Sequence, residues 1–342
     1  MRAHLMNRPI ERVEEGLASV VVAVDDTDDA TRCTSTGEIA SLIAAAAVDL
    51  GGCLRLEVTR HQLLLRDDVP YTSHNSSMVF EALMHPGFID DLRERAIAII
   101  AAHRAETSDP GLCFACVPAQ AERGRCTAAS AGLEAQEVDP AVSELVSFGR
   151  RAKVEFCSKE AAYALAARVP WVVLSEHGGD GAGVVGALAG VGLRLGGCDG
   201  RFRGKWNFAK LCAGELSCSV GAVERRLARD FRGPVQLVDE QGAPLDPALP
   251  FSLDAEGKPI LYDGALTVVC DVVDGVAHPC SKIDLGEIGN VGESWSRVCS
   301  SFEWDNDAEE CLDRTPSCKN CLHRRWVAGG FQCARNRAIG SA

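Results

Sequence analysis

Four aspartates stand within five residues near the N-terminus, in the run Asp25-Asp26-Thr27-Asp28-Asp29. Carboxylates this close repel one another unless a cation neutralises them, and Mg²⁺ is bound by a few carboxylates together with phosphate oxygens. The run therefore predicts a site that holds a magnesium ion and a phosphate group together. The alternative is an acidic surface turn without a catalytic role.

The neighbouring elements place this run between a strand and a helix. Apolar residues 19–24 precede it and predict a buried strand. Ser35 and Glu38 have the spacing of a capping box, which begins a helix expected over residues 37–50. The free N–H groups and the positive dipole end of that helix would receive phosphates close to Thr34.

Four segments together resemble a known family. Val24 to Asp28, followed by Cys33-Thr34, resembles the aspartate-rich signature of the agmatinylcytidine synthetases of isoleucine tRNA, which use ATP to join agmatine to a wobble cytidine. Residues 69–75 resemble that family's Ile-Pro-Trp-Lys-Thr-x-x-Asn segment, shortened by one residue before the threonine. Residues 178–188 resemble its Asn-Gly-x-Gly-Leu-Ile-Gly-Ala-Leu loop, and residues 109–112 its Asn-Pro-Gly strand entry.

The resemblance implies an ATP-dependent ligase or phosphotransferase that activates an acceptor oxygen by phosphorylation before an amine attacks. The catalytic residues would be Asp25, Asp26, Asp28 and Thr34, where Thr34 aligns with a threonine reported as phosphorylated in the family. The remaining contacts to ATP would come from Thr27, Cys33, Ser35, Thr72, Asn75, Gly181, Gly183 and Gly186.

The chain also departs from the family pattern. The family has a longer gap between its aspartates and its Cys-Thr pair, and it usually continues into an oligonucleotide-binding barrel before a zinc ribbon. The acceptor is therefore left open between a tRNA wobble cytidine and a small molecule or protein carrier. A third hypothesis is a non-catalytic, nucleotide-binding accessory protein that contains a metal.

Gly181-x-Gly183-x-x-Gly186 has the spacing of a dinucleotide-binding loop. That motif expects an acidic residue about 20 residues further on, whereas Asp199 comes too early and within a Gly-rich turn. The loop is predicted either to bring backbone N–H groups close to an ATP phosphate or to be purely structural. Lysines at 153, 159, 205 and 210 are further candidate phosphate contacts.

Four cysteines near the end of the chain have the spacing of a metal site: Cys311-x6-Cys318-x2-Cys321-x11-Cys333. A Cys-x-x-Cys pair presents two sulfurs to one metal, and two outer thiolates complete a tetrahedron. The family resemblance implies Zn²⁺, because that family usually carries a zinc ribbon. The spacing is not the usual pair of Cys-x-x-Cys knuckles, so a [4Fe–4S] cluster held by the same four thiolates is the alternative. Cys113 and Cys116 form a second Cys-x-x-Cys, but it lies in a strand-like segment and is expected to be core.

The composition limits the class of protein. The 342 residues, with 46% hydrophobic and 24% charged content, are enough for two or three domains. No apolar stretch reaches the ~20 residues that span a bilayer, and residues 1–9 lack a signal-peptide core, so we expect a cytoplasmic protein with reduced thiols and no membrane partner.

The formal charge of −13 opposes binding to tRNA, since that binding depends on Lys and Arg neutralising phosphates. Residues 311–342 are an exception, because six basic residues stand there against one aspartate, a balance of +5. This tail could contact tRNA or another phosphorylated partner, or it could be a solvated face.

The predicted fold class is α/β (α+β). Alternating strand and helix patterns predict an α/β unit over residues 1–140. The family resemblance implies that this unit is an aspartate-rich, kinase-like ATP-binding domain. The family resemblance implies a ferredoxin-like domain over 141–230. A small β-rich module is expected over 231–298 and a Cys-rich metal-binding tail over 299–342.

Overall fold

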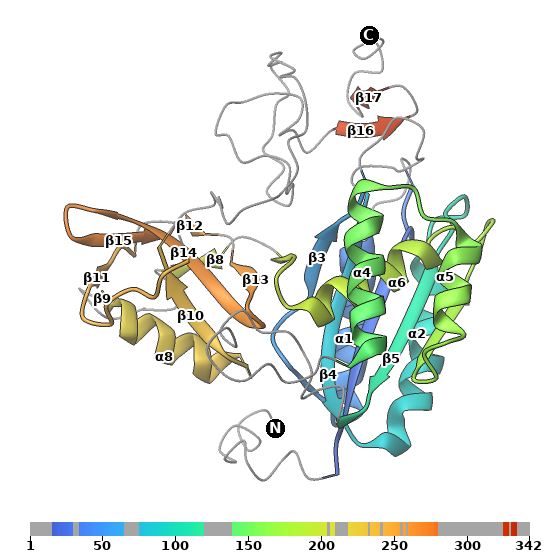
Figure 1. Ribbon diagram of the computed structural model, residues 1–342, viewed down its shortest axis with the longest axis horizontal. Coiled ribbons are helices and arrows are strands. Elements are labelled where there is room, and N and C mark those ends of the chain that lie inside the picture. The colour runs from blue at the N-terminus through green and yellow to red at the C-terminus, as the bar shows by residue number, and fades with distance from the viewer. Residues whose placement is uncertain are drawn as a thin grey trace.

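The computed structural model describes residues 16–29, 34–64, 75–119, 139–203, 206–208, 218–231, 233–239, 242–253, 256–257, 259–279, 324–327 and 330–333. These residues form a mixed α/β fold (Figure 1).

Strands and helices alternate along the first half of the chain, and short strands predominate after it. The strands that these residues form are β1 (Ala18–Asp25), β2 (Cys53–Leu54), β3 (Thr59–Gln62), β4 (Ser76–Met84), β5 (Gly111–Val117), β6 (Val172–Glu176), β7 (Arg201–Phe202), β8 (Trp206–Asn207), β9 (Cys218–Ser219), β10 (Val235–Val238), β11 (Pro250–Phe251), β12 (Glu256–Gly257), β13 (Ile260–Tyr262), β14 (Ala265–Val273), β15 (Val276–Pro279), β16 (Arg324–Val327) and β17 (Gly330–Cys333). The helices are α1 (Thr36–Asp49), the 3₁₀ turn η2 (Pro86–Phe88), α2 (Ile89–His103), α4 (Pro140–Val154), α5 (Lys159–Ala166), α6 (Val184–Gly196) and α8 (Val220–Asp230).

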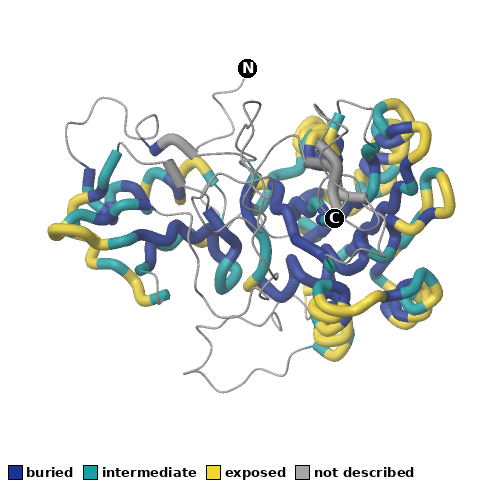
Figure 2. Tube along the Cα trace, turned by 90° about the horizontal axis from the view of Figure 1, so that it is seen from above, coloured by how far each residue is buried: buried dark blue, intermediate teal, exposed yellow. Residues whose placement is uncertain are grey.

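The first part of the main sheet has the order β6-β5-β1-β4-β3, with each neighbouring pair antiparallel. Strand alternation divides the side chains of β1 between two cores. Val20, Val22 and Val24 pack with α1 and α2, whereas Val21 and Ala23 pack with α4, α5 and α6. Figure 1 shows α4 in front of the sheet and α1 behind it. In Figure 2 the strands are mostly buried and the outer faces of the helices are exposed.

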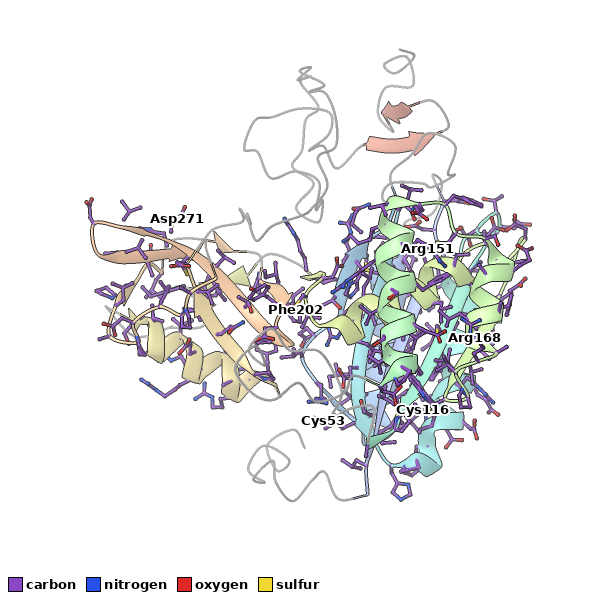
Figure 3. The ribbon with its side chains drawn as sticks, in the orientation of Figure 1. Cys53, Cys116, Arg151, Arg168, Phe202 and Asp271 are labelled. Carbon is purple, nitrogen blue, oxygen red and sulfur yellow. The ribbon has the colours of Figure 1, made fainter. Side chains whose placement is uncertain are left out.

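A second part of the sheet continues through β7, which pairs with β3 on one side and with β13 on the other. Strands β13, β14 and β10 and helix α8 surround a separate core that includes Leu227 and Leu266. Phe202 of β7 is 2% exposed and belongs to this core, while Arg194 of α6 lies 5.9 Å from its ring centroid. Figure 3 labels Phe202 where the two parts of the sheet meet.

The sheet crosses the boundary expected between residues 140 and 141. Strand β6 pairs with β5, and α4, α5 and α6 cover the same core as β1. Residues on both sides of this boundary therefore pack around one core. Likewise, β9 and α8 share a core with residues of the segment 231–298, which was expected to be a separate β-rich module. The identities given to the four expected domains stay predictions.

Helix α4 is the main element that the sequence patterns did not predict. It begins at an N-cap, Asp139, whose carboxylate accepts hydrogen bonds from the N–H groups of Ala141 and Val142, and Pro140 occupies its first turn. Residues 53–62, which alternate in polarity as strand residues do, form two short strands, β2 and β3.

Two expectations about the whole chain can be compared with the described residues. Within them, no helix is long and apolar enough to cross a membrane. Cys113 is buried and Cys116 partly buried on β5, and neither forms a disulfide, which confirms the expectation of core cysteines. Burial raises the pKa of both thiols and keeps them protonated.

Candidate functional site

The aspartate run follows β1, as predicted, and the two faces of the strand determine where its first carboxylate lies. Asp25 has the same parity as Val21 and Ala23, so its side chain faces α6. It is 8% exposed, and a Cβ added at Gly186 in the first turn of α6 would overlap its Oδ2. Burial and then the charge of Asp26 raise the pKa of Asp25 well above its usual range. Asp25 is therefore an internal carboxylate at the positive end of α6.

Asp26 has a left-handed backbone, with φ 55°, that turns the chain away from the sheet. Its pKa is raised to about 7, mainly by burial and then by the charges of Asp109, Asp28 and Asp180. These neighbours come from separate parts of the sequence. The fold therefore gathers carboxylates from the aspartate run, from the residues before β5 and from the Gly-rich loop before α6.

Asp109 holds the Gly-rich loop beside the aspartate run. Its Oδ1 accepts a hydrogen bond from the backbone N–H of Asp180 at 2.6 Å, and its backbone oxygen accepts one from Gly183 at 2.9 Å. Gly181 has φ 74°, a conformation that favours glycine, and a Cβ there would overlap the Glu176 carboxylate. The loop glycines are thus needed for close packing against acidic groups.

Lys159 at the start of α5 supports the loop from the other side. Its ammonium donates hydrogen bonds to the backbone oxygen of Asp180 and to the Glu176 carboxylate, the latter at 3.2 Å. The Tyr163 hydroxyl donates to the same carboxylate at 2.8 Å, and burial together with Glu176 raises the pKa of Tyr163 to about 12. Of the candidate lysines, Lys159 lies at this loop, whereas Lys153 pairs with Asp199.

The start of α1 is joined directly to the aspartate run. The Thr27 hydroxyl donates to the Thr36 hydroxyl at 3.1 Å in a buried contact, and the Thr27 carbonyl oxygen accepts from the N–H of Ala105 at 2.9 Å. The Ser35 side chain accepts from the N–H of Glu38 at 3.2 Å, which confirms the predicted helix start. Thr34, one residue earlier, is partly exposed. The run therefore lies between the first turns of α1 and α6.

The carboxylates of this site supply only part of what a metal ion requires. Among the described residues, no group of three or more His, Cys, Asp or Glu side chains is arranged to hold a metal ion by itself. Mg²⁺ bound to a nucleotide needs only one or two carboxylates, because phosphates and water supply the other oxygens. Burial and then the charges of neighbouring carboxylates raise the pKa of Asp26, and these neighbouring charges fit a site of this second kind.

Some residues predicted to contact ATP or a metal either make a different contact or lie outside the described residues. The Asn75 amide donates to the backbone oxygen of Leu64 at 2.7 Å and closes the β3–β4 hairpin. Thr72, Cys33, Cys311, Cys318 and Cys321 lie outside the described residues, as does the side chain of Cys333 at the end of β17. Their proposed roles stay predictions. Two strands of the basic tail, β16 and β17, form a hairpin.

The sequence patterns did not assign Asp109 or Asp180 to the aspartate site, and they gave Lys159 only as one of four candidate phosphate contacts. Asp109 was part of a segment resembling a strand entry, and Asp180 lay within the Gly-rich loop, so a signal was present in both cases. They come close to Asp26 because β5 pairs with β1. This long-range pairing cannot be predicted from the local sequence patterns.

No protein-family profile matches the chain. No curated protein matches it either. Among solved structures, the chain is similar to apo TiaS, a tRNA agmatidine synthetase, with 20% identity and a TM-score of 0.36 over 51% of this chain and 35% of that one.

It is also similar to a tRNA fluorescent labeling enzyme, with 22% identity and a TM-score of 0.36 over 51% and 36% of the two chains. A complex of TiaS with tRNA and ATP gives 20% identity and a TM-score of 0.37 over the same shares. The chain spans about a third of the length of these structures. The similarity concerns the fold of part of the chain.

Proposed function

We propose that the chain is an ATP-dependent enzyme that transfers a phosphoryl group to an acceptor oxygen. An amine then attacks the carbon that bears this oxygen, and the oxygen leaves with the phosphoryl group as phosphate. The resemblance of its aspartate run to the agmatinylcytidine synthetases of isoleucine tRNA supports this reaction, and tRNA is the acceptor that we propose first.

One observation carries the proposal. The carboxylate of Asp26 lies close enough to those of Asp28, Asp109 and Asp180 for their charges to add to burial in raising its pKa. The residues on either side of Asp26 contact the first turns of two helices, Thr27 that of α1 and Asp25 that of α6. A carboxylate cluster without a cation costs free energy, so its presence beside helix N-termini supports a site for a cation together with phosphates.

In this proposal each group of residues has a separate task. Asp26 and Asp28 face the nucleotide, and Asp25 holds the start of α6 against the end of β1. Thr34, Ser35 and the N–H groups of the first turn of α1 receive phosphates. A bound Mg²⁺ would neutralise charge on the phosphates. Positioning and charge neutralisation then account for most of the rate enhancement.

The test measures the consumption of ATP by the purified protein with Mg²⁺, an amine such as agmatine, and either bulk tRNA or no RNA. Asp26→Asn should lower the rate by roughly 100-fold, the scale of losing one group that stabilises charge in the transition state. Asp91→Asn is the matched control, because Asp91 is exposed in the first turn of α2.

The outcomes separate the hypotheses. ATP consumption that requires tRNA supports the proposed reaction, and consumption without RNA points to a small molecule or protein carrier as the acceptor. Tight ATP binding without consumption would instead identify an accessory protein. Equal rates for Asp26→Asn and the control would contradict the assignment of the site.

A further inference from the structure

Two arginines lie side by side in the middle of the main sheet. Across the strands, Val24 pairs with Met78, Met78 with Arg60, and Arg60 with Arg201. Directly opposed residues of antiparallel strands point to the same face of a sheet. Val24 belongs to the core under α1, so Arg60 and Arg201 also point to the α1 face.

Arg60 is buried with part of its guanidinium unsatisfied. It is 4% exposed, and its Nε donates to the Ser76 hydroxyl at 2.9 Å. Its Nη2 has no hydrogen-bond partner among the residues that the structure describes. A buried cationic donor without an acceptor costs free energy. This geometry therefore favours an anion that accepts a hydrogen bond from the guanidinium.

The Arg60 side chain leans toward the end of β1 where the aspartate run begins. Ser76, its partner, stands two residues before Met78 on β4, and β4 runs antiparallel to β1. Ser76 therefore lies beyond Val24, at the end of the sheet where the aspartate run begins. From Arg60 to β1 the distance is about 10 Å, two strand spacings, and Thr27 joins that end of β1 to the first turn of α1.

A second guanidinium lies on the first turn of α1 itself. Arg203, just after β7, donates from Nη1 to the Ser41 hydroxyl at 2.7 Å. Its Nε would lie 2.7 Å from a Cβ added at Gly37, so the side chain crosses the helix directly at its start. Arg203 follows Arg201 by two residues, and strand alternation places both on the α1 face.

We propose that Arg60, Arg203 and the first turn of α1 form a binding site for the phosphate chain of a nucleotide. The arginines approach from the α1 face of the sheet, while Asp25 lies on the α6 face and Asp26 lies at the turn between them. A phosphate chain along the end of β1 would thus have cationic donors on one side and carboxylates on the other. Planar guanidinium groups suit phosphate oxygens because they donate in pairs.

That the ligand is a nucleotide rests on the proposed function. That the site binds a phosphate chain rests on the arginine geometry alone. The inference is tested with inorganic tripolyphosphate in EDTA, by titration calorimetry. The variants are Arg60→Gln and Arg203→Gln, and the control is Arg93→Gln, since Arg93 pairs with exposed Asp90 on α2.

Both variants should bind tripolyphosphate roughly 10- to 100-fold more weakly than the wild type, the range for one hydrogen bond to a charged group. The control should bind as the wild type does. Thermal unfolding checks that each variant is folded. If Arg60→Gln does not fold because its site is buried, Arg203→Gln alone carries the test.

The inference is overturned if the wild type does not bind tripolyphosphate, or if folded Arg203→Gln binds it unchanged. A short RNA without a 5′-triphosphate that competes as well as ATP would also overturn it, in favour of a nucleic-acid backbone. ATP consumption that is unaffected in Arg203→Gln leaves the proposed function standing without this site. Weakened tripolyphosphate binding without ATP consumption leaves the site standing without the function.

Discussion

The carboxylate of Asp109 accepts a hydrogen bond at 2.6 Å from the backbone N–H of Asp180, which lies 71 residues further along the chain. This contact holds the Gly-rich loop beside the aspartate run, where the charges of both residues raise the pKa of Asp26. One side chain thus connects the structure of the loop with the ionisation of the run.

Removing this acceptor should loosen the loop and change the site. We expect Asp109→Ala to lower the free energy of unfolding by ~1 kcal/mol, the usual net value of a hydrogen bond. The same change should lower the pKa of Asp26, because one neighbouring negative charge is lost. Urea unfolding measures the first effect and NMR titration the second. Asp91→Ala on α2 is the control, and equal behaviour of the two variants would contradict the role of Asp109.

Stability should depend on pH through Asp26. Its pKa of about 7 in the folded chain is above the ordinary value of 3.8, so the folded state binds the proton more tightly than the unfolded state does. Unfolding free energy should therefore fall as the pH rises from about 4 to about 7, once other groups are subtracted. Thermal unfolding in EDTA at pH 5 and pH 8 measures this. Asp26→Asn should reduce the difference and should be more stable than the wild type at pH 8; an unchanged pH dependence would refute the assignment.

The contact between Asp25 and Gly186 should be visible in a double-mutant cycle. Gly186→Ala places a methyl group on the Asp25 carboxylate and should cost about 1–3 kcal/mol of unfolding free energy, as overpacking does. Combining it with Asp25→Ala should cost less than the sum of the single changes, because the obstructing carboxylate is gone. Gly196→Ala, at the other end of α6, meets only the Val146 side chain, at 3.3 Å, and is the control. Strict additivity would show that the two residues do not interact.

The cysteine-rich tail should contain a metal. Purified protein is expected to carry one zinc, or a brown [4Fe–4S] cluster, bound by Cys311, Cys318, Cys321 and Cys333. Elemental analysis and an absorption spectrum distinguish the two. Cys318→Ser should lose the metal, while Cys198→Ser, at an exposed position outside this group, should retain it. Full metal content in Cys318→Ser would eliminate the site.

Local patterns were sufficient for the elements around the aspartate run. A run of valines predicted β1, and the spacing of Ser35 and Glu38 predicted the start of α1. Both features depend on residues close together in sequence: side-chain alternation along a strand and a cap three residues away. Helix α4 was not predicted although Asp139-Pro140 is a common helix start, because the limit between two expected domains was placed at residue 140.

Long-range pairing accounts for the remainder of the site. Antiparallel pairing of β5 with β1 brings Asp109 and, through it, Asp180 to the aspartate run. Pairing of β3 with β4 and β7 aligns Arg60 with Arg201 on the α1 face. A shift of one residue in any of these registers would move each side chain to the opposite face. The sequence alone therefore determines β1 and the start of α1, because these depend on residues close together in the chain. The carboxylates of Asp109 and Asp180 reach the aspartate run only after the strands have paired.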